Sequence, residues 1–252
     1  MQWRNISFNF AGASVLVTGG TGGLGNGIAE AFRDASADVT ITGTRGSAAE
    51  YEEDLSGYRY IQLDVEDRTQ IDAVAAGLPK LDILVNSAGL ALMMLGLDEY
   101  DPDNFERAVT MHLTGVYRIA ARCIPLLEKS TLPGGASIVC MASMSSYFGI
   151  EHVPGYGAGK TGLLGMIRAM AVHWAKSNIR INGMAVGLAR SKMTGMVFDT
   201  PELSEPMLAR VPLGRHGAPA DVAGAALFLS SDAASWITGQ VLPIDGGFSI
   251  AG

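Results

Sequence analysis

Two side chains four residues apart are the strongest sign of chemistry in this sequence: Tyr156 and Lys160, in the stretch GYGAGKTGLLG. Residues at that spacing lie on the same face of a helix. A free tyrosine has a pKa near ~10 and is a poor acid–base group at neutral pH, but an adjacent cation favours the phenolate. The pair therefore predicts a general acid–base catalyst built on Tyr156, whose pKa Lys160 lowers.

A second signal is a glycine-rich stretch near the N-terminus, TGGTGGLG at Thr18 to Gly25, which follows an apolar run. Gly19, Gly23 and Gly25 allow a tight turn and close approach to a pyrophosphate, toward which the following helix would direct free N–H groups and its positive dipole end. The spacing is GxxxGxG rather than GxGxxG, which an ordinary glycine-rich turn could also have. Its place between a strand and a helix favours a dinucleotide site. A third signal is Ser143, thirteen residues before the tyrosine.

Together these residues resemble the pattern of the short-chain dehydrogenases/reductases, and the similarity extends over nearly the whole chain. The matching segments are TGGTGGLG, NSAG at Asn86 to Gly89, Ser143, the Tyr156/Lys160 pair and ITGQVLPIDGG near the C-terminal end. The resemblance implies an α/β fold, a single-domain Rossmann-type doubly wound parallel sheet with helices on both faces. It also implies a nicotinamide cofactor and a Ser-Tyr-Lys active site.

The hydrophobic pattern predicts the same fold. Apolar, β-rich runs alternate with helical stretches, as in a parallel sheet covered on both faces. The runs are Val15 to Thr18, Val39 to Thr42, Tyr60 to Val65, Asp82 to Asn86, Ser137 to Met141 and Ile179 to Val186. Helices are expected at Leu24 to Ala35, Gln70 to Gly77, Pro102 to Glu128, Tyr156 to Ser177 and Pro219 to Ser230. We expect one domain over residues 1–252, in which the proline-containing segment 191–213 forms a substrate lid of loop and short helices.

The bulk composition bounds the class of protein. With 252 residues, 48% of them hydrophobic, the chain can bury a large core. It holds no apolar run of signal-peptide or membrane-span length, which favours a cytoplasmic protein with no membrane partner. The net charge of −7 and the lack of a Lys/Arg cluster argue against nucleic acid as a partner. Cys123 and Cys140 lack metal-site spacing, so we expect buried free thiols and no metal.

The residues after the second strand bear on the choice of cofactor. NAD-selective Rossmann sites have an Asp or Glu there, which hydrogen-bonds the ribose 2′-hydroxyl and repels a 2′-phosphate. Gly43 takes that position here, followed by Thr44 and Arg45, so the carboxylate is absent and a guanidinium is near. This pattern favours NADP over NAD. Arg45 could also be a solvated loop arginine, and Gly22 stands where NADP-using relatives often carry a basic residue.

The resemblance implies further cofactor contacts. It places Asp64 at the adenine and Asn86 to Gly89 at the turn that supports the adenosine ribose, although an Asp and an Asn at strand ends could also cap helices. Gly187 would allow close approach to the nicotinamide, and Ala189 and Ser191 would meet its carboxamide, in a turn where valine replaces the family's usual proline. The full set of expected cofactor-binding residues is Gly19, Thr21, Gly23, Leu24, Gly25, Thr44, Arg45, Asp64, Val65, Asn86, Ala88, Gly89, Tyr156, Lys160, Gly187, Ala189 and Ser191.

Hydride transfer to a carbonyl requires a polarised oxygen, a proton for the developing alkoxide and a fixed nicotinamide. By the resemblance, Tyr156 supplies the proton in reduction or removes it in oxidation. Lys160 would hold the nicotinamide ribose hydroxyls and lower the pKa of the phenol, and Ser143 would hydrogen-bond the substrate oxygen. Ser145 and Ser146 are rivals for that last role, but the thirteen-residue offset favours Ser143.

One position departs from the family pattern. In AVTMHLTGVY, His112 stands where the family usually has the asparagine of an xNLxG motif, which supports a backbone kink and a water that relays protons to the lysine. Histidine titrates near ~6.5 and could take part in this relay with a pH-dependent charge. It could also simply fill the space with a satisfied ring nitrogen. His112 is therefore a candidate catalytic residue with both interpretations open.

Methionine is abundant, at twelve residues, and half of these lie in segments expected to wall the substrate site. Unbranched thioethers adapt to irregular apolar shapes, although these methionines could also be core residues only. The expected wall consists of Met93, Met94, Met141, Met144, Met193 and Met196 with Leu92, Tyr147, Phe148, Val153, Leu188 and Phe198. Few charges accompany them, so the pocket is predicted to be roomy and hydrophobic, for a small apolar ketone or alcohol.

Three functions remain open. The first is an NAD(P)-dependent alcohol dehydrogenase or ketone reductase acting on an apolar secondary alcohol. The second, a 3-oxoacyl carrier-protein reductase, would need a basic surface that the scattered Arg122, Lys129 and Arg168 do not form. The third is a catalytically idle nucleotide-binding regulator, which the intact Ser-Tyr-Lys set disfavours. A homotetramer, or alternatively a dimer, is expected, because the family usually packs its two long helices against symmetry mates and the helix at Tyr156 to Ser177 is apolar around much of its circumference.

Overall fold

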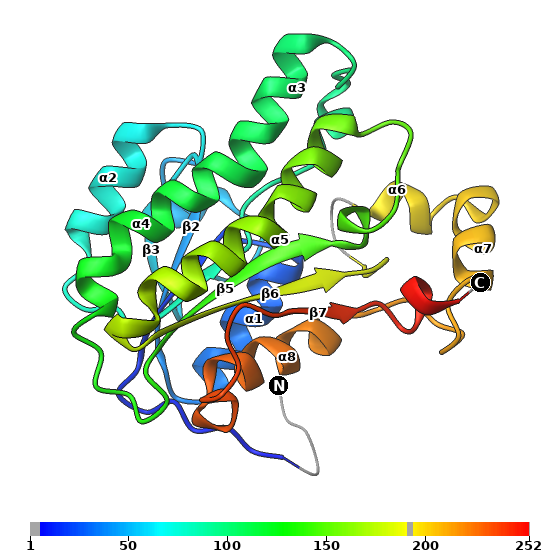
Figure 1. Ribbon diagram of the computed structural model, residues 1–252. Coiled ribbons are helices and arrows are strands. Elements are labelled where there is room, and N and C mark those ends of the chain that lie inside the picture. The colour runs from blue at the N-terminus through cyan, green and yellow to red at the C-terminus, as the bar shows by residue number, and fades with distance from the viewer. Residues whose placement is uncertain (1–5, 191–193, 252) are drawn as a thin grey trace.

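A single parallel sheet organises the protein. The computed structural model describes residues 6–190 and 194–251, in which seven parallel strands pair in the order β3-β2-β1-β4-β5-β6-β7 (Figure 1). The strands are β1 (Ser14–Thr18), β2 (Asp38–Gly43), β3 (Arg59–Gln62), β4 (Ile83–Asn86), β5 (Ala136–Ser143), β6 (Ile179–Val186) and β7 (Val241–Ile244). The order reverses at β1, because β2 pairs with one of its edges and β4 with the other. Open α/β sheets bind ligands outside the carboxyl ends of the strands at such a reversal.

Helices cover both faces of the sheet. They are α1 (Gly23–Asp34), α2 (Arg68–Gly77), α3 (Pro102–Val109), α4 (Gly115–Leu127), α5 (Pro154–Trp174), α6 (Gly195–Phe198), α7 (Pro201–Ala209) and α8 (Pro219–Ser230). In Figure 1, α2, α4 and α5 lie on one side of the sheet and α1 and α8 on the other. The doubly wound architecture with helices on both faces is therefore confirmed.

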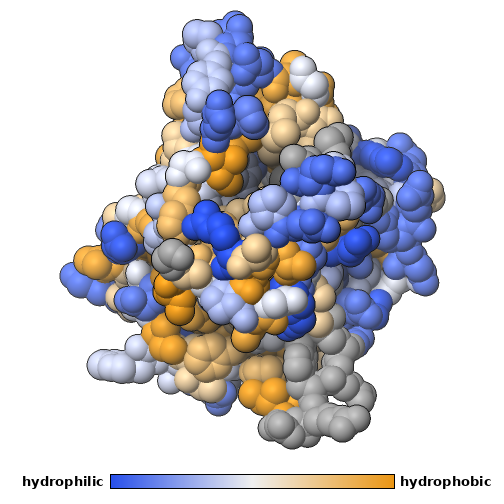
Figure 2. Space-filling view, turned by 90° about the vertical axis from the view of Figure 1, so that its right-hand side faces the viewer, coloured by the Kyte–Doolittle hydropathy of each residue, from blue (hydrophilic) through white to orange (hydrophobic). Residues whose placement is uncertain are grey.

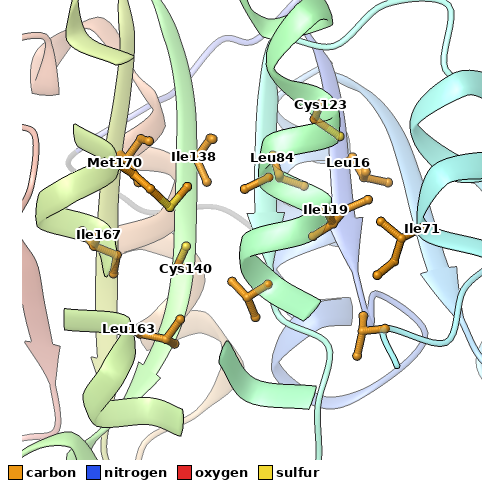
Figure 3. Close-up of a cluster of buried hydrophobic side chains, with 14 of the residues drawn as sticks. Leu16, Ile71, Leu84, Ile119, Cys123, Ile138, Cys140, Leu163, Ile167 and Met170 are labelled. Atoms are coloured by element: carbon orange, nitrogen blue, oxygen red, sulfur yellow. The ribbon is translucent and has the colours of Figure 1, made fainter. Parts of the chain in front are cut away.

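Two hydrophobic cores fill the layers between helices and sheet. Side chains of one strand alternate between the faces, so the inner strands β1, β4, β5 and β6 contribute to both cores. In the first core, Leu84 and Ile138 of the sheet meet Ile119 of α4 and Ile167 of α5 (Figure 3). In the second core, the opposite face of the same strands packs on α1 and α8. The strands in the middle of the sheet are buried on both faces, which explains their continuous apolar sequences.

The structure differs from the expected elements in three places. β3 ends at Gln62 rather than Val65, because it is an edge strand that pairs only with β2. The expected helix from Pro102 to Glu128 is divided into α3 and α4 by a π-helical turn, Thr110–Thr114. β7 was not expected, since it is a short edge strand that contains a proline and is only partly buried. Two short helices, α6 and α7, lie in the segment expected to form a lid.

Across residues 6–190 and 194–251, the helices are too short or too polar to cross a membrane. In the same ranges no cluster of three or more His, Cys, Asp or Glu side chains could hold a metal ion. Cys123 and Cys140 are buried free thiols, as the sequence predicts.

Candidate active site

The glycine turn after β1 forms a cradle at the N-terminus of α1. Gly19 and Gly23 have φ values of +68° and +55°, which favour glycine. A Cβ on Gly25 would lie 2.3 Å from the carbonyl oxygen of Gly19, so no side chain fits there. Gly22 precedes α1 and provides no side-chain cap, which leaves the first N–H groups of the helix available to an anion. These features fit the pyrophosphate of a dinucleotide.

The NSAG turn after β4 is fastened to this glycine turn. The Thr18 hydroxyl accepts hydrogen bonds from the N–H groups of Ser87 at 3.1 Å and Ala88 at 3.2 Å. A Cβ on Gly19 would lie 2.7 Å from the Cα of Ala88, so the two turns are in close backbone contact. Within the described part of the chain, the buried side-chain oxygen of Asn86 has no hydrogen-bond partner, and a bound group could supply one. The two turns meet where the strand order reverses.

The carboxyl end of β2 differs from an NAD-selective site in shape as well as in charge. A Cβ on Gly43 would lie 2.3 Å from the Tyr51 hydroxyl, so an acidic side chain at position 43 would require the tyrosine to move. The same hydroxyl accepts the N–H of Arg45 at 3.0 Å, and the Arg45 guanidinium lies 4.7 Å from the centre of the Tyr51 ring. Tyr60 donates to the Gly43 carbonyl at 2.9 Å. Sequence analysis missed both tyrosines, because no local pattern links them to this strand end.

The remaining expected cofactor residues lie along the same edge of the sheet. Thr21 and Leu24 lie around the start of α1, Thr44 after β2, Asp64 and Val65 after β3, and Gly187 and Ala189 after β6. Asp64 also acts as a local cap, since its Oδ1 accepts the N–H of Glu66 at 2.9 Å. The Thr194 hydroxyl, in the segment expected to form a lid, donates to the Ala189 carbonyl at 2.7 Å. Ser191 lies outside the described residues.

β5 and α5 bring the three expected catalytic residues together. Ser143 is the last residue of β5, and Tyr156 lies in the first turn of α5. The Ser143 side chain hydrogen-bonds the Tyr156 phenol, and the Lys160 ammonium lies 5.6 Å from the centre of the Tyr156 ring. Of the serines that could instead bind the substrate oxygen, Ser146 already donates a hydrogen bond from its hydroxyl to the Lys160 carbonyl at 2.8 Å. Ser143 is therefore better placed than Ser146 to act with the phenol.

The phenol is less acidic than the sequence predicts. Burial raises the pKa of Tyr156 above its ordinary value of 10.0, and the Ser143 hydrogen bond, which favours the phenolate, does not offset it. The negative charge of Glu99 raises this pKa further. The expectation that Lys160 lowers the pKa of Tyr156 is wrong for this arrangement, because the ammonium is directed elsewhere: Nζ donates to the Met141 carbonyl at 2.5 Å.

Lys160 is itself a buried cation. Burial lowers its pKa to about 8, because removal from water disfavours the charged form. The ammonium is therefore present at neutral pH and is lost as the pH rises above this value.

His112 lies in the π-helical turn between α3 and α4. Its Nε2–H donates a hydrogen bond to the Leu90 carbonyl oxygen at 2.9 Å, so in the neutral ring Nδ1 carries no proton. The imidazole meets the Tyr156 ring edge to face, with centroids 4.6 Å apart. Burial, followed by the charge of Lys160, lowers the pKa of His112 to about 3. The imidazole is therefore neutral at physiological pH, and the expected pH-dependent charge is wrong.

The imidazole is wedged between two glycines. A Cβ on Gly89 would lie 2.5 Å from Cε1 of His112, and a Cβ on Gly159 would lie 2.9 Å from its Cβ. The NSAG turn and α5 thus leave room for this ring only because both positions lack a side chain. Within residues 6–190 and 194–251, Nδ1 is buried and has no hydrogen-bond partner, so it is free to accept a hydrogen bond.

A buried carboxylate, which sequence analysis missed, also reaches the catalytic helix. Glu99 is completely buried, and its Oε2 accepts the N–H of Tyr156 at 2.8 Å. In the sequence it belongs to LDEYDPD, an acidic run typical of a solvated loop. No local signal distinguishes it from its acidic neighbours.

The expected hydrophobic wall is only partly present. Leu92, Met141 and Met144 are buried in packing clusters, so these are core residues. Met93 and Met94, in contrast, are 51% and 46% exposed beside the NSAG turn. Figure 2 views the side toward which β5 to β7 point in Figure 1, and hydrophobic residues gather there among hydrophilic ones. Two expected wall groups fall outside the described part of the chain: Met193 and the side chain of Met196.

Comparisons with known proteins agree with this geometry. A family model described as enoyl-(acyl carrier protein) reductase matches residues 19–249. D-threitol dehydrogenase of Mycolicibacterium smegmatis is 31% identical over 260 residues, which cover 99% of this chain and 98% of the relative. The chain belongs to the short-chain dehydrogenase/reductase family.

Other similar members of the short-chain dehydrogenase/reductase family differ in the substrates that their names state. The chain is 32% identical to 3alpha-hydroxysteroid dehydrogenase of Mediterraneibacter gnavus, over 92% of this chain and 94% of the relative. It is also 32% identical to the 3-oxoacyl-[acyl-carrier-protein] reductase MabA of Mycobacterium tuberculosis, over 96% of this chain and 94% of the relative. The family is therefore established more firmly than the substrate.

Two solved structures of similar proteins hold a nicotinamide cofactor. A 7 alpha-hydroxysteroid dehydrogenase complexed with NADH and 7-oxo glycochenodeoxycholic acid superposes with a TM-score of 0.84, at 31% identity and 98% coverage of both chains. The RhlG/NADP active-site complex of Pseudomonas aeruginosa has a TM-score of 0.85 at 28% identity, and covers 96% of this chain and 98% of its own. The protein is thus a short-chain dehydrogenase/reductase, an oxidoreductase that uses a nicotinamide cofactor.

A neutral imidazole predicts how His112 variants behave. His112→Asn should keep the shape of the wild-type pH–rate profile between about pH 6 and 9, because a group with a pKa of about 3 does not titrate there. His112→Ala, which removes the Leu90 hydrogen bond and the packing on Tyr156, should lower kcat by roughly tenfold or more. The measurement is kcat and kcat/KM across this pH range for all three proteins. If the wild-type pH–rate profile showed an ionisation near neutral pH that His112→Asn lacks, the conclusion that the imidazole is neutral would be wrong.

Proposed function

We propose that this protein interconverts an apolar secondary alcohol and its ketone, with Tyr156 as the acid–base group. The observation that carries the proposal is the contact of Ser143 with the Tyr156 phenol, one helical turn before Lys160 and beside the carboxyl ends of the strands. The two buried free thiols favour a cytoplasmic location, because that compartment is reducing.

In this mechanism the bound cofactor supplies hydride to the carbonyl carbon in reduction, or accepts it in oxidation. Ser143 hydrogen-bonds the substrate oxygen and polarises the carbonyl. Tyr156 gives its phenolic proton to that oxygen as negative charge develops, and in oxidation its phenolate removes the proton. Lys160 would hold the ribose hydroxyls of the bound cofactor through its ammonium, which is present below its pKa of about 8.

The raised pKa of Tyr156 bears on the direction of the reaction. At neutral pH the phenol is protonated, which is the form required to donate a proton in ketone reduction. Oxidation requires the phenolate, so it should become faster as the pH rises.

The exposed thioethers of Met93 and Met94 support an apolar substrate, because they lie beside the turn that meets the glycine cradle. The similarity to MabA supports a second candidate, reduction of a 3-oxoacyl thioester. A screen of acetophenone, cyclohexanone and acetoacetyl-CoA with each cofactor separates the two. Turnover of the thioester alone would favour the second candidate, and no turnover of any probe would favour an idle nucleotide-binding protein.

Tyr156→Phe tests the acid–base assignment, because it deletes the proton donor and keeps the ring. Its kcat for acetophenone reduction should fall by about 10²–10⁴. Binding of NADPH, measured by fluorescence titration, should survive. If the variant retained wild-type turnover, another group would carry the proton.

NADP is proposed as the preferred cofactor. Gly43 and Tyr51 leave no room for the carboxylate that would select NAD, and the Arg45 guanidinium lies on the Tyr51 ring at the end of β2. A planar guanidinium suits bidentate recognition of a phosphate. The relatives themselves support either cofactor, since one solved structure holds NADP and another NADH.

Arg45→Ala should weaken NADPH binding by roughly tenfold or more and change NADH binding little, because only NADPH carries the 2′-phosphate. Calorimetric titration with adenosine 2′,5′-bisphosphate and with 5′-AMP measures the same contrast without turnover. Arg59→Ala is the matched control, since Arg59 is an exposed arginine of β3 that donates to the Gly77 carbonyl. A wild-type protein that binds NADH more tightly than NADPH would contradict this assignment.

A homotetramer is also proposed, with the outer face of α5 in an interface between copies. A Cβ on Gly157 or Gly165 would have no atom within 4 Å, and Val172 on the same helix is 80% exposed. A hollow of about 870 Å³ reaches this face at Gly157 and Thr161, although most of its lining is the segment 145–154, which includes the expected substrate-wall residues Tyr147 and Phe148. An apolar helix face of this kind is typical of a helix that packs on a symmetry mate.

Gly165→Glu tests this interface without disturbing the fold of one chain, because nothing occupies the space around Gly165. The wild type should sediment as a tetramer at micromolar concentration and the variant as a smaller species with an unchanged far-ultraviolet circular dichroism spectrum. Gly77→Glu is the matched control, since Gly77 is equally open but lies at the end of α2. A monomeric wild type would contradict the proposal.

A further inference from the structure

Glu99 is a carboxylate with no contact to water. Its relative exposure is 0%, and it lies in the segment between β4 and α3. Oε1 accepts the N–H of Leu92 at 3.2 Å, and Oε2 accepts the N–H of Tyr156 at 2.8 Å. Within the described ranges, no lysine, arginine or histidine nitrogen is recorded in an ion pair with it. Burying an anion is unfavourable unless hydrogen bonds or an opposite charge compensate it. The two N–H groups must therefore supply this compensation for Glu99.

The N-terminus of α5 supplies the compensation. Tyr156 is the third residue of this helix, and its N–H is one of the donors that the helix itself leaves without a partner. Val153 precedes the helix and offers no side-chain cap. Glu99, from a distant part of the chain, caps this helix instead. Its negative charge lies at the N-terminus of α5, which is the positive end of the helix dipole.

The second hydrogen bond links this helix end to the substrate side of the site. Leu92 begins the short turn Leu92–Leu95, which carries the exposed Met93 and Met94. A single carboxylate therefore holds both the backbone of the catalytic tyrosine and the turn proposed to contact substrate.

We propose that Glu99 is a positioning residue, which holds the backbone of Tyr156 and the substrate turn in a fixed relation through its two hydrogen bonds. The consequence for turnover rests on the proposed function of Tyr156. A carboxylate close to a phenol disfavours the phenolate, so Glu99 adds to the effect of burial in raising the pKa of Tyr156. The other groups that face the phenol are Ser143, the neutral His112 and the Lys160 ammonium.

Glu99→Gln removes the charge at nearly constant shape, and its amide can accept only one of the two N–H groups. The pKa of Tyr156, read as the 295 nm difference titration between each protein and its Tyr156→Phe derivative, should fall by roughly half a unit or more. Glu106→Gln is the matched control, since it removes the same charge from an exposed position on α3. It should leave the titration unchanged.

Glu99→Asp separates position from charge. It keeps the carboxylate, but the side chain is one methylene shorter and cannot span both N–H groups. Its Tyr156 pKa should remain near the wild-type value, while kcat for acetophenone reduction falls by roughly tenfold and KM changes less. Hydrogen exchange of the peptide that contains Tyr156 should become faster in both Glu99 variants.

The titration and the hydrogen exchange need no substrate, so they decide the role of Glu99 even if Tyr156→Phe retains turnover and the proposed function fails. The inference is overturned if Glu99→Gln leaves the phenol titration unchanged, or if Glu99→Asp retains wild-type kcat and hydrogen exchange. If Glu99→Gln does not fold, Glu99→Asp alone supplies the deciding measurements.

Discussion

The close packing of α5 against the helix formed by α3 and α4 is the contact on which the rest of the site depends. Gly155, Gly159 and Gly162 share one face of α5, and added Cβ atoms there would lie 2.8, 2.9 and 2.8 Å from side-chain atoms of the facing helix. The two backbones can approach this closely only because that face lacks side chains. The same approach seats the His112 ring against Tyr156 and encloses the base of the site.

Exclusion of water by this packing has the same electrostatic effect on Lys160, His112 and Tyr156. Burial favours the neutral form, so the pKa of Lys160 falls to about 8, that of His112 falls to about 3, and that of Tyr156 rises. Lys160 is the group that retains a positive charge at neutral pH, and Glu99 places a carboxylate near the same helical turn. A protonated phenol near the Lys160 ammonium and the Glu99 carboxylate is suited to donate a proton to a ketone oxygen.

Features that lie within one element or at its end could be predicted from the sequence. The four-residue spacing of Tyr156 and Lys160 specifies one helix face, and the glycines from Gly19 to Gly25 specify a tight turn before a helix. The apolar runs of the inner strands predict a parallel sheet buried on both faces. Edge strands carry weaker patterns, because one edge of each is unpaired and part of its surface is exposed, which is why β7 was missed and β3 was predicted too long.

The sequence by itself therefore determined the family, the sheet and the identity of the candidate catalytic side chains, because each depends on residues that are neighbours along the chain. Only the tertiary structure decided how those side chains are charged and held. The neutrality of His112 and the raised pKa of Tyr156 depend on burial by several elements at once. Glu99 meets Tyr156 across 57 residues, and Tyr51 occupies the space beside Gly43 from the following loop. Contacts between segments that the fold brings together leave no periodic pattern in the sequence.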